Sequence, residues 1–358
     1  MLFEPFSARS LELKNRIVMA PLTRSRATST NTPTPLMATY YEQRATAGLI
    51  IAEGTSPSPN GLGYARIPGL FNKEQMEAWK PVTSAVHAQG GKIFVQLMHC
   101  GRVANLVNLP ASAHVLGPND VVCPGEMHTD LLGMRPHSVP QAMAHADISE
   151  AVAEYAASAA LAIEAGFDGA EIHGANGYLI EQFLNPLINQ RSDDYGGSIE
   201  NRNRFALEIA QAVSTAIGPN KVGIRLSPFG VFNGTGVFPE VQNQYLSLAS
   251  SLSDLRLLYI HLVDHASMGA PAVPAEFKLK LRSCFEGLFI LSGGFDGMSA
   301  QKALLEKRGD LIAFGRPFLA NPDLVRRMRI EAPMNAPDPS TFYVPGAKGY
   351  TDYPTLDA

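Results

Sequence analysis

Short apolar runs alternate with helical stretches eight times along the chain, and this alternation constrains the fold more than any other feature of the sequence. Most of the runs are continuously apolar, which is typical of parallel strands covered on both faces. The predicted strands are Arg16–Leu22, Leu49–Thr55, Lys92–Leu97, Asp168–His173, Lys221–Leu226, Leu257–Val263, Leu288–Ser292 and Asp310–Phe314. Eight strand–helix units in 358 residues favour a single (β/α)8 TIM barrel of the α/β class over a doubly wound sheet. No GxGxxG motif follows the first strand, so the usual dinucleotide-binding fingerprint is missing.

Polar residues mark the starts of the predicted helices. Asp147, with Glu150 three residues later, predicts a capping box ahead of a helix over residues 151–164. Ser198 is predicted to cap a helix over residues 201–216. These boundaries support the alternation of strands and helices.

Two segments exceed a minimal barrel. Residues 99–146 follow the third strand and are rich in proline, glycine and histidine. Because active sites of barrels lie where strands end, we expect this long segment to cover the active site. Residues 331–358 form an irregular tail with three tyrosines, which predicts that the tail packs against the barrel. The domain prediction is therefore one barrel over residues 1–358 with a cover and a tail.

Composition excludes several classes of function. The formal net charge is −4, so the chain offers no positive field to a nucleic-acid backbone. The apolar runs are too short to cross a bilayer, and the N-terminus lacks a signal-peptide pattern. Three cysteines without CxxC spacing argue against a disulfide framework, a zinc site or an iron–sulfur cluster. We expect a soluble cytoplasmic protein with no metal, membrane or nucleic-acid partner.

Glycines after the last two strands point to a phosphate site. Gly293 and Gly294 follow the seventh strand, and Gly315 with Arg316 follows the eighth. Many barrels bind a phosphate at this place through backbone N–H groups and a short helix N-terminus. Arg316 would add a bidentate positive charge. Glycine-rich loops can also simply turn the chain, and that reading stays open here.

Polar side chains at three other strand ends suit a heterocyclic ring. Thr23, Gln96 and Arg225 supply a hydroxyl, an amide and a cation, and Gly54 would let a ring lie close to the backbone. Each residue alone is weak evidence, because an arginine at a strand end is as often an ion-pair partner as a ligand contact. Together with the phosphate site they suggest flavin mononucleotide (FMN), whose reduced ring is anionic and needs a nearby cation.

The turn after the fourth strand carries a second group of candidates. His173 and Asn176 can both present N–H donors to one oxygen atom, and Tyr178 follows two residues later. Donors that converge on an oxygen stabilise charge developing there, and a phenol can protonate a strongly basic carbanion. The alternative is a buried core histidine beside a packing tyrosine. The residues alone do not decide between these readings.

Longer motifs resemble one known family throughout the chain. They are Ala20-Pro-Leu-Thr-Arg24, Gln96-Leu-Met-His-Cys-Gly-Arg102, His173-Gly-Ala-Asn-Gly-Tyr-Leu179, Asn189-Gln-Arg-Ser-Asp-Asp-Tyr-Gly-Gly-Ser-Ile-Glu-Asn-Arg202, Arg225-Leu-Ser-Pro228 and Phe314-Gly-Arg-Pro317. In this order they resemble the old yellow enzyme family of flavin-dependent ene-reductases. The resemblance implies an FMN enzyme that oxidises NADPH or NADH and reduces activated C=C bonds. The implied substrates are electrophilic alkenes such as α,β-unsaturated carbonyl compounds and nitroalkenes, with nitrate esters as a further candidate class.

The resemblance also implies a role for each candidate. The residues expected to bind the cofactor are Pro21, Thr23, Gly54, Gln96, Arg225, Gly293, Gly294, Gly315 and Arg316. His173 and Asn176 would bind the substrate oxygen, and Tyr178 would donate the proton. The remaining residues expected to line the substrate site are Tyr64, Met98 and Tyr350. Met98 stands where many relatives have tryptophan, so substrate range and facial preference are open.

Three alternatives remain at this level. A flavin-free barrel aldolase or isomerase would bind a phosphorylated substrate through the same glycine loops, but it predicts a lysine or a carboxylate base at a strand end. Lys92 and Lys221 instead stand at the starts of strands. A non-enzymatic binding module would leave the histidine, asparagine and tyrosine unexplained. A dienoyl-thioester reductase with an iron–sulfur cluster would need more cysteines.

Overall fold

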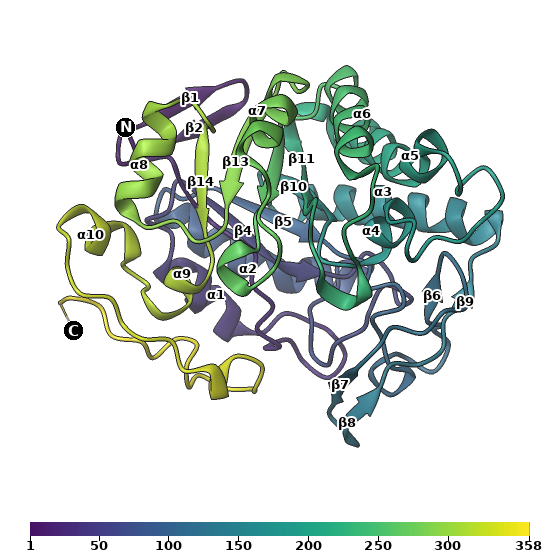
Figure 1. The fold of residues 1–358 in the computed structure, drawn as a ribbon. Coiled ribbons are helices and arrows are strands. Elements are labelled where there is room, and N and C mark those ends of the chain that lie inside the picture. The colour runs from purple at the N-terminus through teal and green to yellow at the C-terminus, as the bar shows by residue number, and fades with distance from the viewer. Residues whose placement is uncertain (358) are drawn as a thin grey trace.

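A closed barrel of parallel strands forms the centre of the computed structural model, which describes residues 1–357 (Figure 1). The barrel strands are β3 (Ile17–Met19), β4 (Leu49–Thr55), β5 (Ile93–Leu97), β10 (Gly169–Gly174), β11 (Val222–Leu226), β12 (Tyr259–Val263), β13 (Leu288–Ser292) and β14 (Leu311–Phe314). Neighbours in the barrel follow chain order, and β14 closes it by pairing with β3. Every residue of these strands is buried, which explains the continuous apolar runs in the sequence. The predicted fold class is confirmed, and only β10 extends beyond its predicted range, by one residue.

A short antiparallel hairpin closes the amino-terminal end of the barrel. Its strands are β1 (Phe6–Ala8) and β2 (Leu11–Leu13). Leu11 and Leu13 are buried in one apolar cluster with Val18, Ile51 and other inward-facing side chains of the barrel. This end is therefore filled with apolar side chains, and the opposite end is left for a site.

Helices surround the barrel (Figure 1). They are α1 (Pro35–Gln43), α2 (Lys73–Ala88), α3 (His145–Glu164), α4 (Leu179–Leu184), α5 (Ile199–Ile217), α6 (Val241–Asp254), α7 (Ala275–Ser283), α8 (Gly297–Leu305), α9 (Arg316–Ala320) and α10 (Leu324–Arg329). The short 3₁₀ helices are η1 (Leu106–Asn108), η2 (Pro219–Lys221), η3 (Phe232–Gly234), η4 (Ala266–Met268) and η5 (Pro339–Thr341).

One predicted helix cap is confirmed, although its helix begins at residue 199 and not at the predicted 201, and the other cap is wrong. Ser198 caps α5, since its side chain accepts a hydrogen bond from the Asn201 backbone N–H. α3 begins before Asp147, which occupies the third helical position instead of the cap. The Asp147 carboxylate reaches back and accepts a hydrogen bond from the Ala144 backbone N–H at 2.7 Å. Its carboxylate therefore serves the first turn from inside the helix.

The long segment after β5 contains regular structure of its own. It includes the strand pair β6 (Leu116–Gly117) and β9 (Gln141–Ala142) and the hairpin of β7 (Glu126–Thr129) and β8 (Gly133–Pro136). The β7–β8 hairpin projects from the body of the protein at the bottom of Figure 1.

Buried arginines fasten the C-terminal tail to the barrel. Arg24 donates hydrogen bonds to the carbonyl oxygens of Phe342 and Gly349, and Arg44 donates one to that of Tyr350. Because a buried carbonyl oxygen without a hydrogen-bond partner costs free energy, these charged donors fix the course of an irregular segment.

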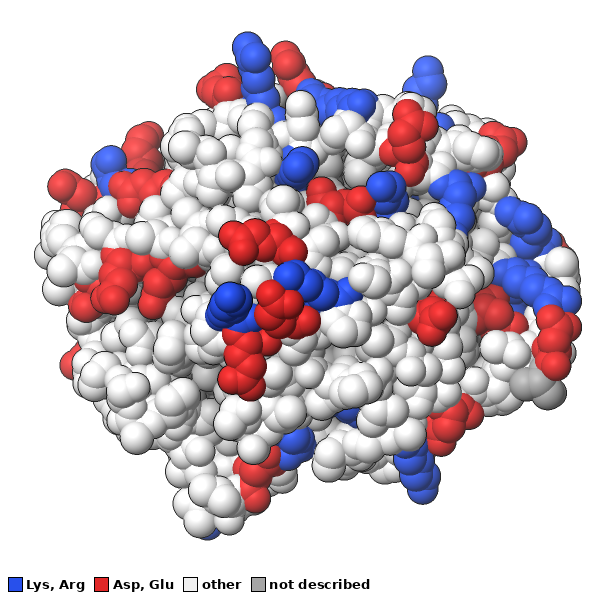
Figure 2. Space-filling view, turned by 180° about the vertical axis from the view of Figure 1, so that it is seen from behind, with Lys and Arg blue, Asp and Glu red and all other residues white. Residues whose placement is uncertain are grey.

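The surface carries both signs of charge. On the face shown in Figure 2, acidic and basic side chains are interspersed among uncharged ones. Across residues 1–357, no helix combines the length and the apolar character needed to cross a membrane. The same residues contain no group of three or more His, Cys, Asp or Glu side chains placed to hold a metal ion.

Candidate active site

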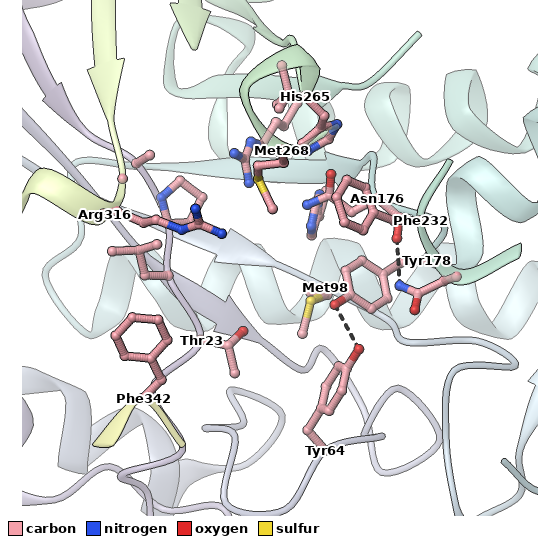
Figure 3. A pocket seen from close by; sticks show the side chains of 18 of the residues that line it. Thr23, Tyr64, Met98, Asn176, Tyr178, Phe232, His265, Met268, Arg316 and Phe342 are labelled. Carbon is pink, nitrogen blue, oxygen red and sulfur yellow. Dashed lines mark hydrogen bonds between the residues drawn. The ribbon is translucent and has the colours of Figure 1, made fainter. Parts of the chain in front are cut away.

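A cavity of about 990 Å³ opens at the carboxyl end of the barrel strands (Figure 3). The structure brings most of the predicted site residues to its wall. They are Pro21, Thr23, Tyr64, Gln96, Met98, His173, Asn176, Tyr178, Arg225, Gly293, Gly294, Gly315 and Arg316. Residues from distant parts of the chain meet here because parallel strands in a barrel end at one rim.

Gly54 does not line the cavity, although it was predicted to contact a bound ring. A Cβ atom added at Gly54 would lie 2.6 Å from both Sδ and Cε of Met98. The glycine therefore makes room for the thioether, which covers it and itself lines the cavity. A larger residue at position 54 would push Met98 toward the cavity.

Tyr350 was predicted to line the substrate site, and the structure corrects this prediction. Its ring is fully buried and stacks on Tyr40, with ring centroids 4.0 Å apart and an interplanar angle of 9°. Phe342 and Tyr343 from the same tail line the cavity instead. The tail follows an irregular course, so the sequence offered no period from which to choose among its aromatic residues.

Glycines at the ends of β13 and β14 form a cradle of backbone. Gly293 and Gly294 both have positive φ angles, of 127° and 69°. A Cβ atom at Gly293 would lie 2.0 Å from the carbonyl oxygen of Asp264, so no other residue fits there. Arg316 is exposed and lines the cavity beside Gly315 (Figure 3). Backbone N–H groups and a guanidinium at one place suit a phosphate.

Gln96 and Arg225 lie deep in the cavity. Gln96 donates its amide N–H to the Glu171 carboxylate at 2.7 Å, and the other oxygen of Glu171 lies 2.9 Å from Nδ1 of His261. Arg225 is 8% exposed, and its Nε atom has no hydrogen-bond partner within residues 1–357. Burial lowers the pKa of Arg225, whereas the nearby Glu171 raises it. A buried guanidinium with a free N–H group suits the carbonyl-rich edge of a ring.

His173 and Asn176 present unpaired polar atoms at the same cavity. Nδ1 of His173 and Oδ1 of Asn176 are buried and have no partner in the described part of the chain. Burial, and then the charge of Arg225, hold the pKa of His173 well below its usual value. A neutral imidazole carries one N–H group, so His173 can donate a hydrogen bond without being charged.

Tyr178 lines the same cavity near Asn176 (Figure 3). Its ring centroid is 5.1 Å from that of His173, and its hydroxyl donates a hydrogen bond to the Tyr64 hydroxyl at 3.1 Å. Burial holds the pKa of Tyr178 well above its usual value, so the phenol keeps its proton. The arrangement can stabilise negative charge on a ligand oxygen and supply a proton next to it.

Other residues at the cavity were not predicted as site residues. Phe232 and His265 line it from loops after β11 and β12, with ring centroids 4.6 Å apart. Burial, and then Arg225, lower the pKa of His265 to about 4. Phe232 begins the three-residue 3₁₀ helix η3, which is too short for a periodic sequence pattern to identify.

The comparisons with known proteins agree with this geometry. A family model described as the NADH:flavin oxidoreductase / NADH oxidase family matches residues 1–335. A probable flavin mononucleotide-dependent alkene reductase of Leishmania infantum is 40% identical over 361 residues, which cover 99% of this chain and 98% of the relative.

Two solved structures share the whole fold. Morphinone reductase in complex with tetrahydroNAD superposes with a TM-score of 0.94 at 43% identity, covering 99% of this chain and 98% of that chain. The old yellow enzyme homologue of Zymomonas mobilis superposes with a TM-score of 0.95 at 40% identity, covering 99% of each chain. The resemblance seen in the sequence motifs is confirmed. The chain belongs to the NADH:flavin oxidoreductase / NADH oxidase family, which includes the old yellow enzymes.

Proposed function

We propose that this protein is an FMN-dependent ene-reductase. It uses hydride from NADPH or NADH to reduce activated C=C bonds in α,β-unsaturated carbonyl compounds and nitroalkenes, with nitrate esters as a further class. The observation that carries this proposal is one cavity that combines a glycine cradle, a buried guanidinium and the group of His173, Asn176 and Tyr178. Similarity to a probable alkene reductase supports the reaction class.

The residues at the base of the cavity fit FMN. Gly293, Gly294, Gly315 and Arg316 would hold its phosphate, and Pro21, Thr23, Gln96 and Arg225 would contact its ring system. The unpaired Nε atom of Arg225 supports this assignment, because a buried donor without a partner costs free energy that a ring carbonyl recovers. When bound, FMN supplies the redox chemistry, accepting hydride from the nicotinamide nucleotide and delivering hydride to the alkene.

His173 and Asn176 bind the oxygen of the substrate's carbonyl or nitro group. As hydride reaches the β-carbon, negative charge develops on that oxygen, and the two donors stabilise it. Tyr178 holds a proton that it transfers to the α-carbon, and the Tyr64 hydroxyl keeps the Tyr178 ring in place through their hydrogen bond. Tyr64 and Met98 line the same cavity and select substrates by shape.

Residues 99–146 serve as the cover of the active site, and residues 331–358, of which the structure describes all but the last, as a tail that completes its mouth. Met127, His128 and Met134 from the first segment and Phe342 and Tyr343 from the second line the cavity, which supports this assignment. The rest of residues 1–358 forms the FMN-binding barrel.

NADPH and NADH are both candidate reductants, and the complex of morphinone reductase with tetrahydroNAD supports a nicotinamide nucleotide in this role. A cytoplasmic location is part of the proposal. The three cysteines, Cys100, Cys123 and Cys284, are free thiols, as in proteins of reducing compartments.

The flavin-free aldolase or isomerase is not favoured. No lysine lines the cavity within the described residues. Lys92 instead pairs with Asp168 at 2.8 Å, where β5 and β10 begin. A Schiff-base mechanism would need a lysine at the other end of the barrel.

An anaerobic stopped-flow experiment tests the proposal. We expect the purified protein to be yellow, to be bleached by NADPH or NADH, and to regain its colour when 2-cyclohexen-1-one is added. A colourless protein that does not take up FMN would refute the cofactor assignment. A protein that NADPH and NADH bleach, but that no electrophilic alkene re-oxidises, would refute the reaction.

A further inference from the structure

A buried carboxylate lies directly behind the turn that carries Asn176 and Tyr178. Glu181, on α4, is 2% exposed. Its carboxylate accepts hydrogen bonds from the Gly177 backbone N–H at 2.5 Å, the Ser227 hydroxyl at 2.9 Å and the Tyr245 hydroxyl at 3.1 Å. The side chain does not line the cavity, so it does not touch a ligand there.

The hydrogen bonds of Glu181 fix a turn that is costly to form. Asn176 and Gly177 both have positive φ angles, of 60° and 77°, and asparagine pays a steric cost in this region. Ser227 Oγ accepts a hydrogen bond from the Asn176 backbone N–H at 2.9 Å while donating to Glu181. The carboxylate therefore holds the N–H group of Gly177 directly and that of Asn176 through one hydroxyl.

A second contact holds the same turn from the opposite side. Gln182 Nε2 donates a hydrogen bond to the Gly177 carbonyl oxygen at 2.8 Å. Asn233 Nδ2 also donates a hydrogen bond to the Asn176 carbonyl oxygen at 2.7 Å. Of the side chains bonded to the turn, only Glu181 can change its charge near neutral pH, so its ionisation can make the geometry of the turn depend on pH.

The surroundings of Glu181 determine the pKa of its carboxyl group. Burial raises the pKa of Glu181 to about 7, although its hydrogen bonds with Gly177, Ser227 and Tyr245 act to lower it. Tyr245, from α6, is the titratable side chain that faces Glu181, and no Lys, Arg or His within residues 1–357 acts on the Glu181 carboxylate. Burial holds the pKa of Tyr245 well above its usual value, so this tyrosine stays neutral.

We propose that Glu181 is a positioning residue whose ionised carboxylate holds the turn that presents Asn176 and Tyr178 to the substrate. The ionised form makes all three hydrogen bonds with the strength that a charged acceptor gives, whereas protonation removes the charge and adds an O–H group that needs an acceptor of its own. Protonation thus loosens the turn, and ligand affinity falls as the pH falls through about 7. The identity of the ligand rests on the function proposed above.

Binding to the oxidised FMN-loaded protein tests this without turnover. 2-Cyclohexen-1-one has no titratable group in this range, and the flavin absorbance reports its binding. For the wild type we expect the Kd to rise about tenfold between pH 8 and pH 6, the size of effect that one lost hydrogen bond to a charged group produces. Glu181→Gln should bind more weakly at pH 8, and its Kd should not depend on pH.

The Tyr245→Phe variant distinguishes a positioning role of Glu181 from a merely structural one. Loss of one donor to the carboxylate should move the midpoint of the pH dependence upward, while the contacts with Gly177 and Ser227 remain. Glu208→Gln is the matched control, because Glu208 also accepts a hydrogen bond from a tyrosine, Tyr195, but on α5 away from the cavity. This control should leave the Kd and its pH dependence unchanged.

Hydrogen exchange at the Asn176 and Gly177 amides provides a test that needs no ligand. We expect their protection to fall below pH 7 in the wild type, after correction for intrinsic rates, and to be low at all pH values in Glu181→Gln. Unchanged protection in the wild type between pH 8 and pH 6 would overturn the inference. So would a Tyr245→Phe variant with an unshifted midpoint. A protein that shows the expected exchange but binds no enone would overturn the proposed function alone.

Discussion

The floor and the mouth of the cavity are built in different ways. The floor consists of Gln96, His173 and Arg225, which lie on barrel strands and are at most 8% exposed. The register of the sheet places them, since His173 pairs with Arg225 on β11, and Gln96 pairs with Glu171 on β10. Each floor side chain therefore has little freedom to move.

The mouth consists of the β7–β8 hairpin and the tail residues Phe342 and Tyr343. Tyr343 is 61% exposed, and its backbone is held by a hydrogen bond from Arg66. This difference between floor and mouth predicts which property of the enzyme a substitution changes. Substitutions in or beside the floor should alter the chemistry or cofactor binding, whereas substitutions at the mouth should alter which ligands enter.

The largest effect is expected at the proton donor beside the floor. Tyr178→Phe should slow enone reduction by about 10²–10⁴, the range typical of a lost general acid. Reduction of the flavin by NADPH or NADH should persist, because that step needs no proton from Tyr178. Stopped-flow measurement of the two half-reactions separates the effects. Enone reduction at the wild-type rate, or a block in flavin reduction, would remove Tyr178 from the role of proton donor.

Nitroalkenes and phenols are internal controls for the Tyr178→Phe variant. Nitroalkenes should suffer less, because their carbanions are stable enough to be protonated by water. A phenolate oxygen should still bind to His173 and Asn176 and produce a long-wavelength charge-transfer band. His173→Leu should weaken that band.

A second prediction concerns the exclusion of water from the barrel interior next to the floor. Burial raises the pKa of Glu53, on β4, to about 7, with hydrogen bonds from Arg24 and Tyr41 opposing the shift. Because the folded-state pKa exceeds the usual 4.5, this carboxyl favours the folded state at low pH, and that contribution is lost as the pH rises through about 7. The wild type should thus lose about 2–3 kcal/mol of unfolding free energy between about pH 5 and pH 8, relative to Glu53→Gln.

Urea unfolding at a fixed FMN concentration measures this difference at each pH. Glu12→Gln, at an exposed carboxylate, supplies the baseline. If the difference in unfolding free energy between the wild type and Glu53→Gln did not change with pH, water would have to reach Glu53. The barrel beside the floor would then be no more rigid than the mouth.

A third prediction concerns cofactor binding at the floor. Arg225→Ala should weaken FMN binding by about 1.5–3 kcal/mol, the contribution of a hydrogen bond to a charged group. Equilibrium dialysis or fluorescence titration of the apoprotein with FMN gives the affinity directly. Unchanged FMN affinity together with an unchanged reduction potential would show that the guanidinium does not contact the ring.

The same contrast explains what the sequence could predict. The barrel strands were identified because continuous apolar runs follow directly from burial on both faces. Residues at strand ends, such as Gln96 and Arg225, could be grouped from the sequence because those ends meet at one rim. The family motifs then named Tyr178 and Asn176, which lie in a turn rather than on a strand.

Predictions failed where the sequence has no periodic pattern and where a contact joins residues that are far apart in the sequence. Tyr350 and Tyr343 lie in the same irregular tail, and long-range contacts place them: Tyr350 stacks on Tyr40, whereas Arg66 binds the Tyr343 carbonyl oxygen at the cavity. Gly54 and Met98 are far apart in sequence, so their contact was not visible. The start of α3 was misplaced because Asp147 can serve a helix end from inside the helix as well as from the cap.

The smallest effect is expected at the mouth. The Arg66 guanidinium pairs with Asp130 of the β7–β8 turn and donates hydrogen bonds to the carbonyl oxygens of Ser25 and Tyr343. Because the pair is partly exposed, its loss should cost about 0.5–1 kcal/mol. Arg66→Ala should therefore change the relative Kd of bulky and small enones by about twofold to fivefold, leaving flavin reduction intact. Arg282→Ala is the matched control, since Arg282 also binds one carboxylate and two carbonyls, at the opposite end of the barrel. Added salt should reproduce the Arg66→Ala ranking in the wild type. An unchanged ranking in Arg66→Ala, or an equal change in Arg282→Ala, would mean that the mouth does not select ligands.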